Sequence, residues 1–182
     1  MKNTIKVDSS WTLFLDRDGV INQKLEGDYV KRLSEFQFIP GALESIAQFN
    51  KIFQRILVVT NQQGIGKGLM SHEDLSNVHD YMFSKINASG GRIDKVYYCP
   101  ELQQNNSNCR KPNTGMPKEA QLDFPEIDFA KCIMVGDSHS DIEMGKRLKM
   151  TTVFLSEHGR QSDPKSDFVF SSLEEFKKSL VA

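Results

Sequence analysis

The chain has 182 residues, of which 38% are hydrophobic and 26% charged, which is typical of a folded globular protein and argues against disorder. This length suits one domain with a full-sized core and is too short for two large ones, so we expect residues 1–182 to form a single domain. The net charge of −1 offers no general attraction to nucleic acid or anionic membranes; no apolar run approaches the roughly 18 residues of a membrane span, and we expect a soluble monomer.

The first predicted strand, residues 11–15 (WTLFL), is a short apolar run that ends in the acidic sequence DRDG. Asp16 and Asp18 are two residues apart at the end of this strand, where they could share one cation. Gly19 then allows the backbone to turn sharply. The polar and aromatic segment 23–38 has no clear period, and we interpret it as a flap over the end of the strand.

Helices and strands alternate along the rest of the chain. The pattern predicts, in order, a helix from Gly41 to about Phe53, a strand at 56–59 ending at Thr60, a glycine-dense loop at 62–68, a helix from Ser71 to Gly90, a strand at 95–99, a polar loop at 99–112, a helix at 117–122, a strand at 133–135, a helix at 138–149, strands at 151–155 and 168–170, and a closing helix from Ser172 with Glu175 completing a capping box.

This alternation predicts an α/β fold with a three-layer, Rossmann-like parallel sheet. In such a sheet, ligands gather at the carboxyl ends of the strands. Asp16, Thr60 and Asp137 each follow a different predicted strand. The sequence therefore predicts that three strands direct oxygen-bearing side chains into one crevice.

These side chains suit phosphate-ester hydrolysis. Carboxylates such as Asp16, Asp18 and Asp137 are the oxygen ligands that Mg²⁺ prefers. With its charge compensated by the metal, one carboxylate can attack phosphorus and form an aspartyl-phosphate, while a second moves protons. Lys111 and the Thr60 hydroxyl supply charge and hydrogen bonds for the phosphate oxygens.

Four short motifs resemble those of the haloacid dehalogenase (HAD) superfamily of phosphohydrolases. DRDG at 16–19 is similar to its first motif, Thr60 in VVTN to its second, Lys111 to its third, and GDSHSD at 136–141 to its fourth. All four occur in the family's order, which implies a HAD-like fold and a magnesium cofactor. The intervals between the motifs leave no room for a large cap domain.

Three longer strings, LFLDRDGVIN, TNQQGIGKG and CRKPNTGM, resemble the branch that contains D-glycero-D-manno-heptose-1,7-bisphosphate phosphatase and histidinol-phosphate phosphatase. This resemblance implies that Asp16 is the nucleophile and Asp18 the general acid/base. The other implied roles are a metal site of Asp16, the Asp18 backbone carbonyl and Asp137, phosphate contacts from Thr60 and Lys111, substrate contacts from Asn61, Gln62, Gln63 and Arg110, and an orienting role beside the metal for Asp141.

Two positions depart from the pattern of this branch, which commonly carries a zinc-bound loop patterned Cys-x-His and Cys-x-Cys. Cys99 and Cys109 match its outer positions, but Glu101 and Ser107 occupy the other two. Two thiolates do not complete a tetrahedral site, so we predict no zinc and a loop organised by hydrogen bonds. The second departure is Ser138, where the branch often has a lysine that faces the substrate.

The three cysteines are an odd number, and the polar start MKNTIKVDSS has no signal-peptide pattern, so we expect a reducing cytoplasm. We predict a magnesium-dependent phosphomonoesterase acting on a small phosphorylated metabolite, with D-glycero-D-manno-heptose 1,7-bisphosphate (a sugar bisphosphate) favoured over histidinol phosphate. The neutral charge disfavours a DNA phosphatase. A catalytically silent phospho-ligand-binding module is the alternative from another class, and the complete carboxylate set speaks against it.

Overall fold

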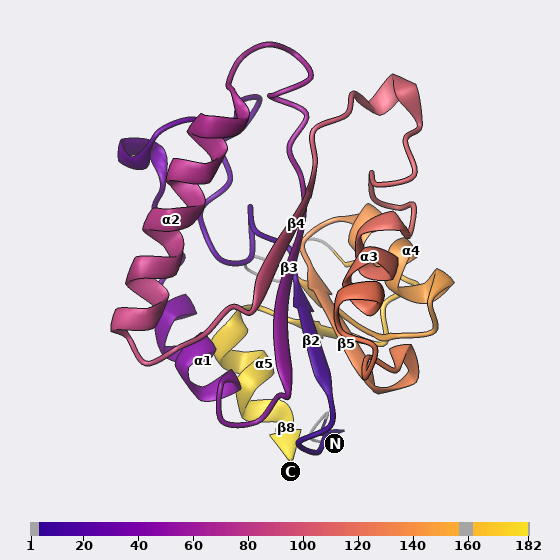
Figure 1. Ribbon diagram of the computed structural model, residues 1–182. Helices are drawn as coiled ribbons and strands as arrows, with labels where there is room; N and C mark the ends of the chain where they lie inside the picture. Colours follow the sequence, from indigo (N-terminus) through magenta and orange to yellow (C-terminus); the bar gives the residue numbers. More distant parts are fainter. Residues whose placement is uncertain (1–3, 157–161, 182) are drawn as a thin grey trace.

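The computed structural model describes residues 4–156 and 162–181, and a six-stranded parallel sheet lies at its centre (Figure 1). The strand order is β4-β3-β2-β5-β6-β7, so β2 is a central strand with β3 on one side and β5 on the other. The strands span Thr12–Leu15 (β2), Arg55–Asn61 (β3), Lys95–Cys99 (β4), Cys132–Gly136 (β5), Thr151–Leu155 (β6) and Phe168–Phe170 (β7).

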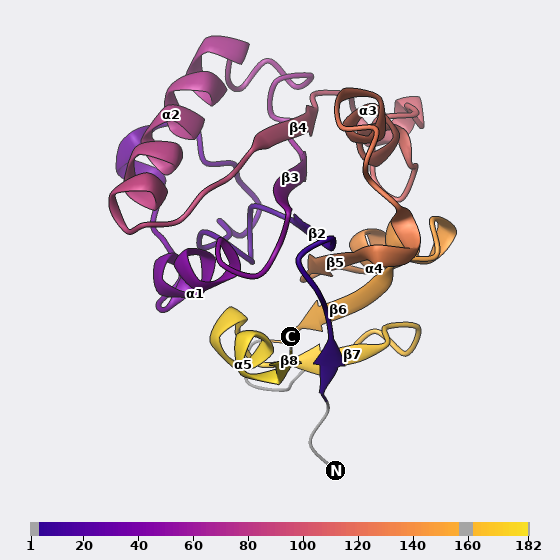
Figure 2. The same cartoon turned by 60° about the horizontal axis from the view of Figure 1, so that its bottom comes forward.

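Helices cover both faces of the sheet (Figures 1 and 2). One face carries α1 (Ala42–Phe49), α2 (His72–Ala88) and α5 (Leu173–Ser179), and the other carries α3 (Gly115–Asp123) and α4 (His139–Arg147). The core divides in the same way, because side chains alternate along each strand: Leu13 and Leu15 pack in the cluster under α1, α2 and α5, whereas Phe14 packs in the cluster under α3 and α4. The predicted three-layer α/β fold is confirmed.

The connection from β2 to β3 contains the flap, a short 3₁₀ turn η1 (Leu33–Glu35) and α1, and no large cap is inserted there or elsewhere among the described residues. Backbone pairing holds the base of the flap, since Gln23 N donates to Gln37 O at 2.8 Å and Ile39 N donates to Ile21 O at 3.0 Å. The flap therefore rises from a fixed base at the carboxyl end of β2. Two further 3₁₀ turns are η2 (Gln103–Asn105) and η3 (Phe129–Lys131).

The observed elements differ from the prediction in several places. A small parallel pair, β1 (Ile5–Lys6) with β8 (Leu180–Val181), was not predicted, because strands of two residues carry no readable period. Helix α1 ends at Phe49, although Phe53 N still bonds to Phe49 O in a following turn. At α5, Ser172 Oγ accepts from Glu175 N as predicted, but the Glu175 carboxylate returns to Ser171. Over the described ranges, no helix is long and apolar enough to cross a bilayer.

Candidate active site

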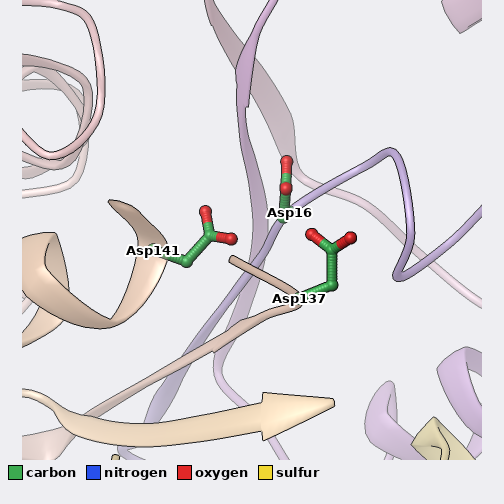
Figure 3. A group of neighbouring side chains, drawn as sticks. All are labelled: Asp16, Asp137 and Asp141. Carbon is green, nitrogen blue, oxygen red and sulfur yellow. The ribbon is translucent and has the colours of Figure 1, made fainter. Parts of the chain in front are cut away.

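Three carboxylates converge at the carboxyl edge of the sheet (Figure 3). Asp16 follows β2, Asp137 follows β5, and Asp141 lies in the first turn of α4. One oxygen from each lies within 4.8 Å of the others, and Asp16 and Asp141 are 8% and 0% exposed. Because three carboxylates at this separation repel one another strongly, the cluster requires a cation or protons.

The cluster fits a magnesium ion. Asp137 Oδ1 is buried and has no hydrogen-bond partner among the described residues, as a free metal ligand would be. Burial and the neighbouring Asp141 carboxylate raise the pKa of Asp16 to about 8, and the same two causes raise the pKa of Asp137. An all-oxygen donor set of this kind matches the ligands of Mg²⁺.

Glycine is required beside this cluster. Gly19 has φ +86°, and a Cβ at this position would lie 2.1 Å from Asp137 Oδ2. A Cβ on Gly136 would lie 2.2 Å from Asp141 Cβ. The carboxylates can approach one another only because these two positions have no side chain.

Lys111 contacts two of the three carboxylates and is only 4% exposed. Its Nζ is 2.8 Å from Asp16 Oδ1 and 2.6 Å from Asp141 Oδ1, and it donates to Val59 O at 2.9 Å. Burial alone would lower the pKa of Lys111, but Asp141 and Asp16 outweigh it and raise the pKa above its usual value. Lys111 is therefore charged, and all three of its donors are engaged within the protein.

The Asp18 carboxylate is not part of the three-carboxylate cluster. Its Oδ1 accepts from Arg17 Nη2 at 3.0 Å and from Asn22 Nδ2 at 2.9 Å, and its Oδ2 accepts from Gln62 Nε2 at 2.9 Å. Burial opposes ionisation, but the Arg17 guanidinium and these hydrogen bonds lower the pKa of Asp18 overall. The free site thus holds this carboxylate ionised and in one orientation.

The sequence did not predict that Arg17 and His79 hold the Asp18 carboxylate in place. Arg17 is fully buried, and its Nη1 lies 3.2 Å from His79 Nε2 on α2. Burial and the Arg17 charge lower the pKa of His79 to about 3, so this imidazole is neutral and its ring nitrogen accepts from the guanidinium. An arginine between two aspartates is visible in the sequence, whereas nothing in the helical pattern distinguishes His79 from an ordinary core residue.

The predicted substrate-binding residues divide into two groups. Asn61 and Gln62 are held inside the protein: the Asn61 amide bonds to the backbone N–H and carbonyl of Lys111, and Gln62, 1% exposed, also donates to Thr60 Oγ1 at 2.9 Å. Gln63 Oε1 accepts from Gln103 N at 3.3 Å and joins two loops. Arg110 lines the cavities beside the site.

Two adjoining cavities open over the carboxylates. The smaller, of about 240 Å³, includes Asp16, Asp18 and Thr60 in its lining. The larger, of about 480 Å³, extends under the loop that carries Gln103 and Asn106. Four residues line both cavities: Asn61, Arg110, Lys111 and Ser140. The flap and the loop after β4 therefore frame one site with room for a small phosphorylated molecule.

The loop after β4 differs from the prediction. Cys99 and Cys109 form a disulfide with a Cα–Cα distance of 5.3 Å. The prediction of a loop organised by hydrogen bonds was therefore wrong, because a covalent bond links the two ends of this loop. Hydrogen bonds contribute as well, since Asn113 Nδ2 donates to Ser107 O at 2.9 Å and Asn105 Nδ2 donates to the Glu101 carboxylate at 3.0 Å. The strand end and the turn before Arg110 bring together two cysteines ten positions apart. The absence of zinc stays a prediction.

Comparison with known proteins agrees with this architecture. A HAD-hydrolase-like family model matches residues 108–176. The D-glycero-alpha-D-manno-heptose-1,7-bisphosphate 7-phosphatase of Mycobacterium bovis is 36% identical over 169 residues, which cover 91% of this chain and 89% of that protein. The corresponding enzyme of Campylobacter jejuni is 35% identical over 152 residues, covering 83% and 86%.

A solved structure gives the same result. The D,D-heptose 1,7-bisphosphate phosphatase from B. bronchiseptica, complexed with magnesium and phosphate, matches with a TM-score of 0.84 and 27% identity over 92% of this chain and 96% of that one. The similarity extends over nearly the whole of both chains. The chain belongs to the heptose-1,7-bisphosphate 7-phosphatase family of the haloacid dehalogenase superfamily of phosphatases.

Proposed function

We propose that this protein removes the 7-phosphate of D-glycero-D-manno-heptose 1,7-bisphosphate in a magnesium-dependent reaction with Asp16 as nucleophile. One observation carries the chemical part of the proposal: the buried Asp16 carboxylate lies between the Lys111 ammonium, at 2.8 Å, and the Asp137 and Asp141 carboxylates. The names of the relatives support the choice of substrate.

Asp16, Asp137 and the backbone carbonyl of Asp18 would hold the magnesium ion. Asp141 is as close to the cluster as the other two carboxylates, but Lys111 and the Ser138 backbone and hydroxyl already bond to it, which supports an orienting role. Magnesium supplies the positive charge that lets an anionic carboxylate approach an anionic phosphate. We propose no zinc site.

In the first step, an Asp16 oxygen forms a bond to phosphorus while the ester P–O bond breaks and its electrons pass to the departing sugar oxygen. Thr60 and Lys111 both line the smaller cavity, where Thr60 would donate to a phosphoryl oxygen and Lys111, whose donors are held by the protein, would supply its charge beside Asp16. In the second step, a water oxygen forms a bond to phosphorus while Asp18 takes a proton from that water. The P–O bond to Asp16 breaks, its electrons return to the Asp16 carboxylate, and inorganic phosphate is released. Because Asp18 is ionised in the free site, the proton for the departing oxygen must be taken up when substrate binds.

The size of the site supports a small bisphosphate. The transferring phosphate would occupy the smaller cavity, and the larger cavity, with Arg110 at the border of the two, offers space and positive charge for the rest of the substrate. We further propose that residues 1–182 act as one domain, as a monomer and in the cytoplasm, without nucleic acid or membrane partners. The nearly neutral charge supports these proposals.

The test is phosphate release with Mg²⁺ from both anomers of the heptose bisphosphate, histidinol phosphate and simple sugar phosphates. We expect the heptose bisphosphate to give the highest kcat/KM, and Asp16→Asn to lose a factor on the order of 10³ or more. Asp123→Asn, an exposed carboxylate at the end of α3, is the control and should keep full activity. Equal turnover in wild type and Asp16→Asn would refute the nucleophile, and no turnover of any phosphate ester would favour a silent binding module.

A further inference from the structure

One cation that lines the site, Lys24, has no role in the function proposed above. Four carboxylates, from Asp16, Asp18, Asp137 and Asp141, are opposed by the buried cations Arg17 and Lys111, which already contact protein acceptors. A further carboxylate in the lining, Asp28, is paired with Lys31. A divalent ion would bring this group to neutrality. A phosphate dianion that then enters needs positive charge from other side chains, and the remaining cations in the cavity linings are Lys24 and Arg110.

Lys24 reaches the metal site from the flap. Its Nζ lies 3.3 Å from Asp137 Oδ2, and it lines the smaller cavity together with Asp16 and Thr60. The Lys24 side chain is 53% exposed, whereas that of Asp137 is 17% exposed. The ammonium therefore lies on the solvent side of the Asp137 carboxylate and borders the cavity that would receive a phosphoryl group.

The backbone beside Lys24 is fixed, while its side chain is not. Asn22 is fully buried and donates to the Asp18 carboxylate, and Gln23 N donates to Gln37 O. Among the residues that the structure describes, the only polar contact of the Lys24 side chain is the one to Asp137. The side chain can thus swing while its Cα stays in place.

The residue that follows Asp137 supplies no competing cation. Ser138 is uncharged, and its hydroxyl lies 2.6 Å from Asp141 Oδ2 as part of the cap of α4. Ser138 nevertheless lines the same cavity as Lys24. A positive charge at position 138 would therefore face the same space.

We propose that Lys24 is a phosphate-binding residue, and that its ammonium leaves Asp137 for the phosphate when the metal binds to Asp137. In the metal-free site Lys24 neutralises Asp137; when magnesium occupies Asp137, the ammonium leaves and donates to an oxygen of the phosphoryl group in the smaller cavity. Lys24 then opposes metal binding weakly and favours phosphate binding. This inference rests on the proposed function only in taking a phosphoryl group as the ligand, and it is independent of the sugar.

Equilibrium binding tests this exchange without turnover. Calorimetric titration would measure Mg²⁺ binding to the phosphate-free protein and orthophosphate binding to the magnesium-loaded protein. Lys24→Met should bind Mg²⁺ up to about fivefold more tightly, the upper range for an exposed ion pair, and orthophosphate about tenfold more weakly, as for a lost hydrogen bond to a charged group. Lys24→Arg should behave like wild type.

Lys95→Met is the matched control, because Lys95 forms a similar exposed pair with Asp123 at 2.6 Å at the start of β4. It should change neither affinity. Adding Ser138→Lys to Lys24→Met should restore orthophosphate binding, since it returns a cation to the same cavity. Unchanged orthophosphate affinity in Lys24→Met would overturn the proposal, and so would weaker Mg²⁺ binding. If the substrate screen fails while these affinities change as stated, only the assignment of the sugar is refuted.

Discussion

At the scale of single residues, the general acid/base that we propose depends on a buried arginine. Arg17 is fully buried, and its guanidinium bridges the Asp18 carboxylate and the His79 ring nitrogen. Its Nη1 and Nη2 donors meet acceptors in this way, which offsets much of the cost of burying a guanidinium. A protonated His79 could not accept this hydrogen bond, so Arg17 couples the orientation of Asp18 to the charge of an imidazole on α2.

This arrangement predicts a loss of stability in acid. The pKa of His79 is about 3 in the folded protein, against an ordinary 6.5 when unfolded. Between these values the unfolded chain binds the proton and the folded chain does not, so the stabilising contribution is fully present above 6.5 and falls by up to about 1.4 kcal/mol per pH unit as the pH drops towards 3. Urea unfolding across this window measures the slope. His79→Gln should show a shallower dependence than wild type, because glutamine accepts from Arg17 without titrating.

The matched control is His72→Gln, a change at an exposed histidine at the start of α2. It should leave the acid dependence of stability as in wild type. Comparison between variants is needed because Asp16 acts in the opposite direction: its raised pKa makes the metal-free protein less stable as the pH rises. Identical pH slopes for wild type and His79→Gln would contradict the assignment of a neutral His79.

At the scale of elements, the loop after β4 carries the main departure from prediction. The motif CRKP marked Arg110 and Lys111 as site residues by resemblance, since a loop separates both from the end of β4, and both line the smaller cavity. The disulfide between Cys99 and Cys109 was not predicted, since an odd number of cysteines without a signal peptide is typical of a reducing compartment. Within such a compartment the bond would be open to reduction.

The disulfide should act on substrate binding more than on chemistry, because it closes the loop that borders the larger cavity while the carboxylates lie on other strands. Cys109→Ser, or a dithiol reductant on the wild type, is expected to raise KM several-fold with little change in kcat, and to lower the free energy of unfolding by about 2–4 kcal/mol. Steady-state kinetics and urea unfolding measure the two effects.

Cys132→Ser is the control for this experiment, because Cys132 is a buried free thiol in β5. The KM of Cys132→Ser should equal that of the wild type. A KM that stays the same on reduction would contradict a role for the crosslink in substrate binding. One equivalent of tightly bound zinc in the purified protein would overturn both the crosslink and the zinc-free prediction.

At the scale of the whole molecule, local patterns predicted the sheet and its functional edge. Continuous apolar runs predicted β3 and β5, and parallel topology then required Asp16, Thr60 and Asp137 to meet at one edge. Contacts between exposed side chains far apart in sequence could not be predicted. Lys24 and Asp137, for example, are 113 positions apart. The backbone pairing of β1 with β8 could not be predicted either, because strands of two residues have no periodic signal.

The same limit explains the inward direction of Asn61 and Gln62. Their positions after β3 marked them as site residues, but their hydrogen bonds depend on the loop that brings Lys111 back to β3 and on the turn after β2. Sequence could place these amides at the edge of the sheet. Only the assembled fold shows that they hold Lys111 and Asp18 in place.

The central claim is that the phosphoryl group passes through Asp16. The most direct test mixes magnesium-loaded protein with heptose bisphosphate, quenches in acid within one turnover, and locates the phosphoryl group by peptide mass spectrometry. Asp18→Asn should accumulate it, since this variant lacks the base for the second step. The predicted result is one phosphoryl group on the peptide that contains Asp16, absent in Asp16→Asn; full-rate hydrolysis with no phosphorylated peptide at any time would contradict the account.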